Sequence, residues 1–132
     1  MQRAVALLLL FTAACRAPYD KPNSICDLPR GARGWSGTEV RWKGAMVGTF
    51  QHGFALVTEE CARRGMSLGS WDSAELDQAL RAKSKEPGVL RVDVSAKIVG
   101  ERPRLRITEV HRISFQPLSY EQEEAYWRSK GF

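Results

Sequence analysis

Apolar and polar residues alternate with a period of two over much of this chain, which is the pattern of half-buried β-strands. The alternation and the turn residues between runs predict five strands, at about residues 38–46, 54–58, 66–68, 90–98 and 105–115. In the first strand Val40, Trp42 and Met46 form the inward face, and Gly44 indicates a bulge or a sharp bend. The fourth strand is the most regular, because every second residue in it is apolar.

The fifth strand interrupts this alternation near its middle. Its apolar parity places Glu109 and His111 inward and Val110 outward. Either a bulge near residues 108–110 resets the register, or the mouth of a barrel is polar there. An acid beside a histidine also allows a buried, pH-sensitive pair, although a structural hydrogen bond at a bulge is the favoured interpretation.

The segment before the fourth strand changes to a helical pattern. Asp72 as the N-cap and Glu75 three positions later predict a capping box. Trp71 and Leu76 stand at the positions of a hydrophobic staple around that cap. Lys83 is expected to face water on the polar side of the helix, and a Pro-Gly pair ends it.

A second helix is predicted at the C-terminus, where Ser119 and Gln122 form a capping box and acidic residues precede basic ones. The predicted order is therefore three strands, a helix, two strands and a final helix, a mainly β domain with α-helices. Over about residues 38–117 this order resembles the OB-fold, a five-stranded Greek-key barrel. Another small α+β domain is the alternative.

The N-terminus has the layout of a secretory signal. Arg3 precedes the apolar run Ala4–Phe11, which is too short to span a bilayer comfortably, and small residues then lead to Cys15. Residues Thr12–Cys15 resemble the lipobox of bacterial lipoproteins, with Thr12 where that family prefers Leu. The resemblance implies cleavage before Cys15, acylation of that cysteine and hence a membrane anchor.

An ordinary signal cut after Ala14 is the alternative, and it would give a soluble periplasmic or secreted protein. Arg16, rather than Asp, follows the cysteine. By resemblance to lipoproteins this favours the outer membrane, with the domain facing the periplasm. The predicted organisation is a signal peptide (1–14), a flexible tether (15–25), a barrel domain (26–118) and a terminal helix (119–132).

The two other cysteines, Cys26 and Cys61, form an even pair that predicts a disulfide in an oxidising compartment. A hairpin of the first two strands would bring them within bonding range, and two buried free thiols are the alternative. His52 and His111 are far apart in sequence, and no Cys-x-x-Cys motif occurs. We therefore expect no metal site.

Charge narrows the choice of partners. The chain has 20 Lys and Arg against 15 Asp and Glu, a net charge of +5, and the charges are interleaved. Nucleic-acid binders carry a more concentrated basic stripe, so we expect no nucleic-acid partner. If the first and fourth strands are neighbours, their outward residues and the start of the fifth form a surface for an anionic envelope component or a protein partner. This candidate surface, for which an ordinary solvated exterior is the alternative, comprises Arg41, Lys43, Arg91, Lys97, Arg104 and Arg106.

No motif for catalysis is present. The chain lacks Gly-x-Ser-x-Gly, His-Glu-x-x-His and a phosphate-binding loop, so we expect no catalytic residues and no cofactor. The favoured function is a non-catalytic binding or interaction module of the cell envelope. A small hydrolase acting on envelope material, with Glu109 and His111 in a deep pocket, and a structural or stress protein are the alternatives. His52 beside Phe50 and Phe54 is interpreted as a turn residue rather than a contact surface.

Overall fold

The computed structural model describes residues 25–27, 35–61 and 64–132. The predicted signal peptide and lipobox, and the predicted tether up to residue 24, lie outside the described residues. Five strands and two α-helices follow the predicted order. The elements are η1 (Ile25–Asp27), β1 (Glu39–Thr49), β2 (Gly53–Val57), β3 (Gly65–Trp71), α1 (Ala74–Lys85), β4 (Gly88–Val99), β5 (Arg104–Pro117) and α2 (Tyr120–Ser129).

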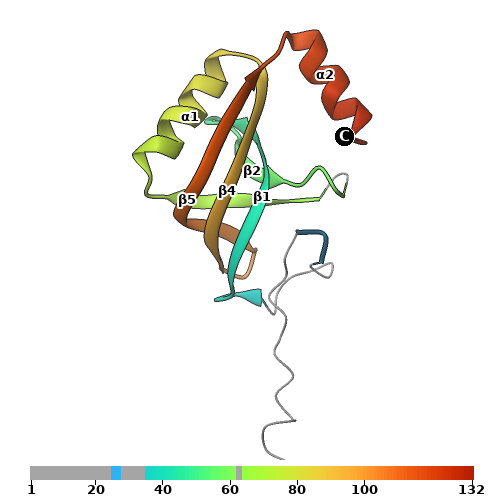
Figure 1. Cartoon of the computed structure of the whole chain (residues 1–132). Coiled ribbons are helices and arrows are strands. Elements are labelled where there is room, and N and C mark those ends of the chain that lie inside the picture. The colour runs from blue at the N-terminus through green and yellow to red at the C-terminus, as the bar shows by residue number, and fades with distance from the viewer. Residues whose placement is uncertain (1–24, 28–34, 62–63) are drawn as a thin grey trace, which may run out of the picture.

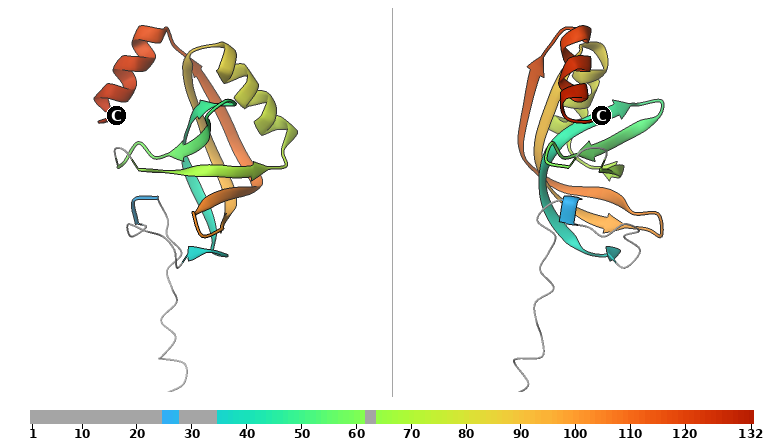
Figure 2. Two further views of the ribbon diagram at one scale, coloured as in Figure 1. Left: turned by 180° about the vertical axis from the view of Figure 1, so that it is seen from behind. Right: turned by 90° about the vertical axis from the view of Figure 1, so that its right-hand side faces the viewer.

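The five strands close on themselves in the order β1-β2-β3-β5-β4, with β4 paired to β1 (Figure 1). All neighbouring strands are antiparallel except β3 and β5, which are parallel. β1 belongs to two ladders: Glu39–Met46 pairs with β4, and Ala45–Thr49 pairs with β2. Figure 2 shows the strong curvature of β1, β4 and β5 that this closure requires.

Apolar side chains on the predicted inward parity fill the inside of the ring. Trp42 and Met46 of β1 are 1% and 0% exposed, and every second residue of β4 from Leu90 onward is buried as well. Leu76 and Leu80 of α1 are fully buried in the same core. A helix that lies outside a closed ring of strands can place side chains in its interior only through an open end. α1 therefore covers one end of the ring.

Gly44 marks a close approach of two strands. The sequence indicated a bulge or a sharp bend here, and the pairing of β1 with β4 is continuous past this residue, so the bulge is excluded. A Cβ at this position would lie 2.2 Å from the carbonyl oxygen of Val57 in β2. β1 passes here from one ladder to the next, and only a residue without a side chain leaves room for the β2 backbone.

Two bulges explain the interrupted alternation of β5. The register against β4 shifts twice, and the residues skipped are Thr108 and His111. Between the bulges Val110 packs against the core, and Glu109 lies outside with 68% of its side chain exposed. The bulge predicted near residues 108–110 is confirmed. The inward placement of Glu109 and His111 is wrong, because each bulge shifts the parity by one residue.

α1 begins one residue later than predicted. Ser73, not Asp72, is the N-cap, and its Oγ accepts a hydrogen bond from the backbone N–H of Leu76 at 3.1 Å. Trp71 is still the last residue of β3, so the chain needs one more residue to turn into the helix. With Ser73 as the N-cap, the N3 residue is Leu76, so the predicted capping box does not form, and Trp71 and Leu76 do not stand at staple positions. The Trp71 indole instead donates to Asp77 Oδ1 at 3.3 Å.

α2 begins with the predicted capping box. Ser119 Oγ accepts from the Gln122 N–H at 3.2 Å, and Gln122 Oε1 accepts from the Ser119 N–H at 2.9 Å. Lys83 of α1 does not face water as predicted: its side chain is 10% exposed, and Nζ lies 3.6 Å from Glu123 of α2. Glu123 also accepts from the Gly88 N–H at 3.0 Å, so it joins α2 to α1 and to the start of β4.

α2 packs on the outside of the ring, where Figure 1 shows it across the β4–β5 pair from α1. The cluster beneath it is separate from the main core. Its β1 and β4 members belong to the outward parity, so the helix covers apolar residues that would otherwise be exposed. The cluster comprises Ala45, Val57 and Val89, with Val47, Leu118, Tyr126 and Trp127 packed around them.

The predicted Cys26–Cys61 disulfide is confirmed, with the two Cα atoms 5.8 Å apart. Two further contacts attach η1 to the domain. Ile25 is 4% exposed and belongs to the main core, although the sequence places it at the end of the tether. Arg64 Nη1 donates to the carbonyl oxygen of Cys26 at 2.9 Å. The segment that enters the domain is therefore attached by a covalent bond, apolar packing and a hydrogen bond.

Candidate functional site

The outward residues of β1, β4 and β5 form a grid of mostly polar side chains. Backbone positions that are opposite one another on neighbouring strands lie about 5 Å apart, so each row of the grid spans about 10 Å. The rows are Glu39–Lys97–Arg106, Arg41–Ser95–Glu109, Lys43–Asp93–Arg112 and Ala45–Arg91–Ser114.

An open pocket of about 480 Å³ lies over the last two rows, bounded on one side by the segment that follows β2. This volume is large enough for a small ligand. Charged side chains of both signs surround it. The lining residues are Lys43, Gly44, Thr58, Glu59, Glu60, Arg91, Val92, Asp93, Arg112 and Ser114.

Asp93 is the most buried charged residue of the pocket, with 11% of its side chain exposed. Arg41 donates from Nε and Nη2 to its two carboxylate oxygens, each at 3.1 Å. These hydrogen bonds, together with the charges of Arg41 and Lys43, lower the pKa of Asp93 although partial burial acts in the opposite direction. Asp93 is therefore ionised at neutral pH, and Arg41 is its direct partner.

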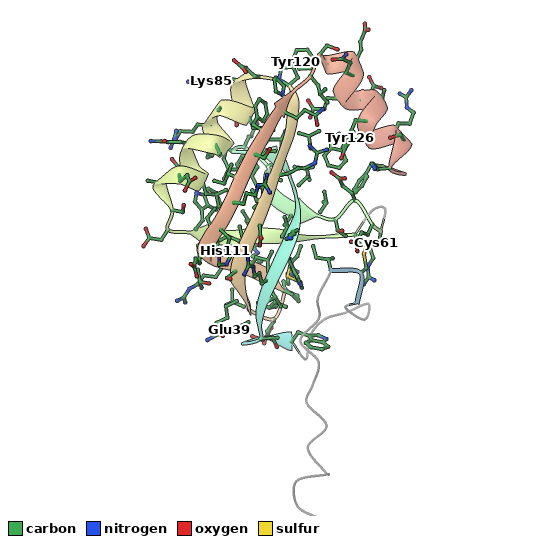
Figure 3. The ribbon with its side chains drawn as sticks, viewed as in Figure 1. Glu39, Cys61, Lys85, His111, Tyr120 and Tyr126 are labelled. Carbon is green, nitrogen blue, oxygen red and sulfur yellow. A yellow bond between two sulfur atoms is a disulfide. The ribbon has the colours of Figure 1, made fainter. Side chains whose placement is uncertain are left out.

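Arg91 and Glu59 connect the pocket to α2. Arg91 donates to Glu59 at 3.1 Å, to Gln116 at 2.8 Å and to the Tyr126 hydroxyl at 3.1 Å. The Tyr126 hydroxyl in turn donates to Glu59, and Figure 3 shows Tyr126 on the side of α2 that faces the strands. These bonds use all three nitrogens of Arg91, so the network forms a fixed wall of the pocket.

The network also sets the charge states of its members. Partial burial alone would raise the pKa of Glu59, but the hydrogen bond from Tyr126 and the charge of Arg91 outweigh it and lower the pKa. Burial and the hydrogen bond to Glu59 raise the pKa of Tyr126, which keeps its hydroxyl a neutral donor. Lys130 Nζ lies 4.0 Å from the second oxygen of Glu59 and adds to its positive surroundings.

Lys43 and Arg112 are cations of the pocket without a direct acidic partner. Within the part of the chain that the structure describes, neither side chain makes an ion pair or a hydrogen bond, and both residues are exposed. Lys43 exerts only a longer-range attraction on Asp93, which lies between the two cations in the same row. The pocket therefore has hydrogen-bond donors of positive charge that are available to a ligand.

The six residues of the predicted basic surface lie in two separate groups. Its residues lie on the outside of the strands as expected, but only some of them are close to one another. Arg41, Lys43 and Arg91 lie at or beside the pocket, whereas Lys97, Arg104 and Arg106 lie at the opposite end of the grid. Arg41 and Arg91 are already bound to acids, so Lys43 alone of the predicted set offers an unengaged cation to the pocket.

Sequence reasoning missed Arg112, Ser114 and Glu60. The signal for Arg112 was present, because Ile113 has the inward parity and its neighbour must then face outward. Pairing with β4 places Arg112 directly opposite Asp93, but this follows only when both β5 bulges are counted. Glu60 carries no signal of its own, since it lies in the irregular segment after β2.

Glu109 and His111 lie outside the pocket. His111 Nε2 is 2.7 Å from Ser95 Oγ, and its Nδ1 is 3.8 Å from Glu109 Oε1. The side chain of Glu109 is 68% exposed, so the two residues are not a buried pair, and His111 forms a hydrogen bond at a bulge. Apolar side chains fill the inside of the ring, so the described part of the chain does not place Glu109 and His111 in a deep pocket.

His52 lies in the turn between β1 and β2, where its backbone N–H donates to Thr49 Oγ1 at 3.1 Å. Phe50 of the same turn is 46% exposed and meets Phe54 edge to face at 5.0 Å between ring centroids. The Arg81 guanidinium lies 5.2 Å from the centre of the Phe50 ring. Contacts with Phe54 of β2 and Arg81 of α1 therefore stabilise the turn.

Comparison with known proteins adds no assignment. No protein-family model matches the chain, and no curated protein and no solved structure matches it significantly. No helix among residues 25–27, 35–61 and 64–132 is long and apolar enough to cross a membrane. In the same residues, no three side chains of His, Cys, Asp or Glu come together in a way that could hold a metal ion.

Proposed function

We propose that this chain is a non-catalytic binding module of the cell envelope, anchored by lipid on Cys15, whose pocket on β1, β4 and β5 binds an anionic group. We also propose that its domain is an OB-fold. The strand order, the parallel pairing of β3 with β5 and the helix between β3 and β4 support that fold.

The proposal that the ligand is an anion rests on one observation. Lys43 and Arg112 line the same pocket from either side of Asp93, whose charge is already met by Arg41. Two cations without direct partners raise the local concentration of anions. Ammonium and guanidinium groups both form charge-assisted hydrogen bonds with phosphate or carboxylate oxygens.

Titration with inorganic phosphate, followed through the backbone amide NMR signals, tests the site. We expect shifts at the pocket residues and about tenfold weaker binding in Lys43→Ala and Arg112→Ala, which is the scale of one lost charged contact. Lys97→Ala removes a cation of the same face outside the pocket and should bind like the wild type. Equal binding by all three variants, or no binding by the wild type, would contradict the anion site.

The anchor needs a separate experiment. Cys15→Ser removes the residue that would carry the lipid, so we expect the variant to lose lipoprotein processing and the mature lipidated form to vanish from the detergent phase. If the variant is processed and retained at the membrane like the native chain, Cys15 is not the anchor.

A further inference from the structure

The charged groups of the pocket differ in whether they already have partners. Glu59 is bound by Arg91 and Tyr126, and Asp93 is bound by Arg41, so neither acid is available to a ligand. Glu60 differs from both. Its side chain makes no hydrogen bond or ion pair with any residue that the structure describes, although it lines the pocket and is exposed.

Glu60 is held at the edge of the pocket by its backbone. Its N–H donates to Thr58 Oγ1 at 3.3 Å, and Thr58 itself is 5% exposed. The segment that carries both residues continues from Val57, which pairs with Ala45 of β1. Glu60 therefore borders the pocket on its β2 side, whereas Arg112 borders it on β5. One unengaged acid and the two unengaged cations surround the same space.

We infer that the pocket selects a zwitterionic ligand, in which a phosphate group lies between Lys43 and Arg112 and an amine is bound by Glu60. This inference rests on the proposed anion site and names its ligand class. A simple anion would leave the Glu60 carboxylate facing it and repelling it, whereas an ammonium group on the ligand turns that repulsion into attraction. A phosphate has enough oxygens to accept from both cations at once.

A pair of probes that differ only in the amine tests the inference. O-Phosphoethanolamine carries a phosphate and an ammonium group, whereas ethyl phosphate carries the same phosphate and an uncharged methyl. Calorimetric titration of the full mature chain in detergent micelles should show about tenfold tighter binding of O-phosphoethanolamine, the scale of one charged contact. Glu60→Gln should remove that preference, because the neutral amide keeps the shape but not the charge.

Glu121→Gln is the control, since it removes an exposed acid of α2 that does not line the pocket. Equal affinity of the wild type for both probes would overturn the inference and leave the anion site intact. A preference that survives in Glu60→Gln would also overturn it. If neither probe binds, that result contradicts the proposed anion site itself.

The same ligand chemistry occurs free in solution and in a lipid headgroup. Micelles containing phosphatidylethanolamine should displace bound O-phosphoethanolamine if the headgroup is the source, and micelles with the same fraction of phosphatidylglycerol should not. If neither lipid displaces the probe, a soluble ligand is the source. Displacement by both lipids alike would count against recognition of the amine.

Discussion

Asp93 lies among three cationic side chains of the outer face. Arg41 binds it directly, and Lys43 and Arg112 flank it in the same row of the grid. A carboxylate with so little access to water is costly unless cations and hydrogen bonds replace the lost hydration. Arg41 supplies these contacts to Asp93, so Lys43 and Arg112 remain available to a ligand.

Removal of Arg41 should show how much Asp93 depends on it. We expect Arg41→Ala to raise the pKa of Asp93, because the first cause of its lowered pKa is the hydrogen bonding from Arg41. A lowered native pKa stabilises the fold above the unfolded-state pKa, and this stabilisation is lost as the pH falls through the native pKa. The variant should therefore be less stable than the wild type at neutral pH.

Carbon-detected NMR titration of Asp93, combined with urea unfolding at several pH values, measures both effects. The stability difference between the two proteins should shrink as the pH falls through the native pKa of Asp93. A difference that is constant over that range would mean that Arg41 stabilises the protein by another route.

β5 is the element in which side-chain direction departs most from the simple strand pattern. Without bulges, Glu109 would point into the core and Val110 into solvent. The two skipped residues, Thr108 and His111, reverse that assignment between them. They also return Arg112 to the outer face opposite Asp93, so the composition of the pocket depends on both bulges.

A pair of substitutions separates the two registers of β5. Val110→Asp places a charge against the core and should lower the free energy of unfolding by about 2 kcal/mol or more. Glu109→Ala changes an exposed side chain and should alter it by less than about 0.5 kcal/mol. Chemical denaturation of both variants decides between the registers, since in an uninterrupted strand Val110 would face solvent and Val110→Asp would change the stability little.

α2 is held to the ring by polar contacts as well as by its apolar face. We expect Tyr126→Phe to lower stability by about 1 kcal/mol, because it removes the hydroxyl that donates to Glu59 and accepts from Arg91. The pKa of Glu59 should rise at the same time, since the bond from Tyr126 helps to lower it. Tyr120→Phe is the control, because Tyr120 is 77% exposed and its hydroxyl makes no hydrogen bond within the described residues.

The pH dependence of Tyr126→Phe has a definite sign. Glu59 has a lowered native pKa, so its stabilising effect is complete above the unfolded-state pKa and is lost as the pH falls through the native one. Denaturation curves should therefore show the variant approaching the wild type in acid. Equal losses for Tyr120→Phe and Tyr126→Phe would mean that the network does not hold α2.

On the scale of the whole molecule, the ring is closed by β1 and β4, and the disulfide attaches the entering segment to it. The bond joins Cys26 of η1 to Cys61 in the segment between β2 and β3. Ile25 of the same segment belongs to the core, so the attachment is more than a covalent link.

Loss of the disulfide should weaken the domain without changing its fold. We expect the double change Cys26→Ser and Cys61→Ser to lower the free energy of unfolding by roughly 2–4 kcal/mol, because the unfolded chain gains freedom. Thermal melts with and without reductant measure this for the native protein. If reduction has no effect on the melt, packing of Ile25 and its neighbours is sufficient to hold the segment.

The sequence by itself determined the order of the elements of this protein and the inward faces of β1 and β4, but not that of β5 between its bulges. The period of two in β4 and the three-residue spacing of Ser119 and Gln122 depend only on near neighbours, so both could be predicted. The disulfide followed from a hairpin and an even number of cysteines. At the start of α1 the local signal was ambiguous, because Asp72 and Ser73 are both good caps and the end of β3 decided between them.

Only the tertiary structure decided which charges are bound and which are available. Arg41, Lys43 and Arg91 are alike in the sequence, but Arg41 meets an acid 52 residues away and Arg91 meets one 32 residues away. Those encounters depend on strand register, on two bulges and on the placement of α2. Side-chain charges act through space over a few ångströms. Local sequence therefore cannot say which acid will lie within that reach, and the pocket with its unengaged cations emerges only from the folded chain.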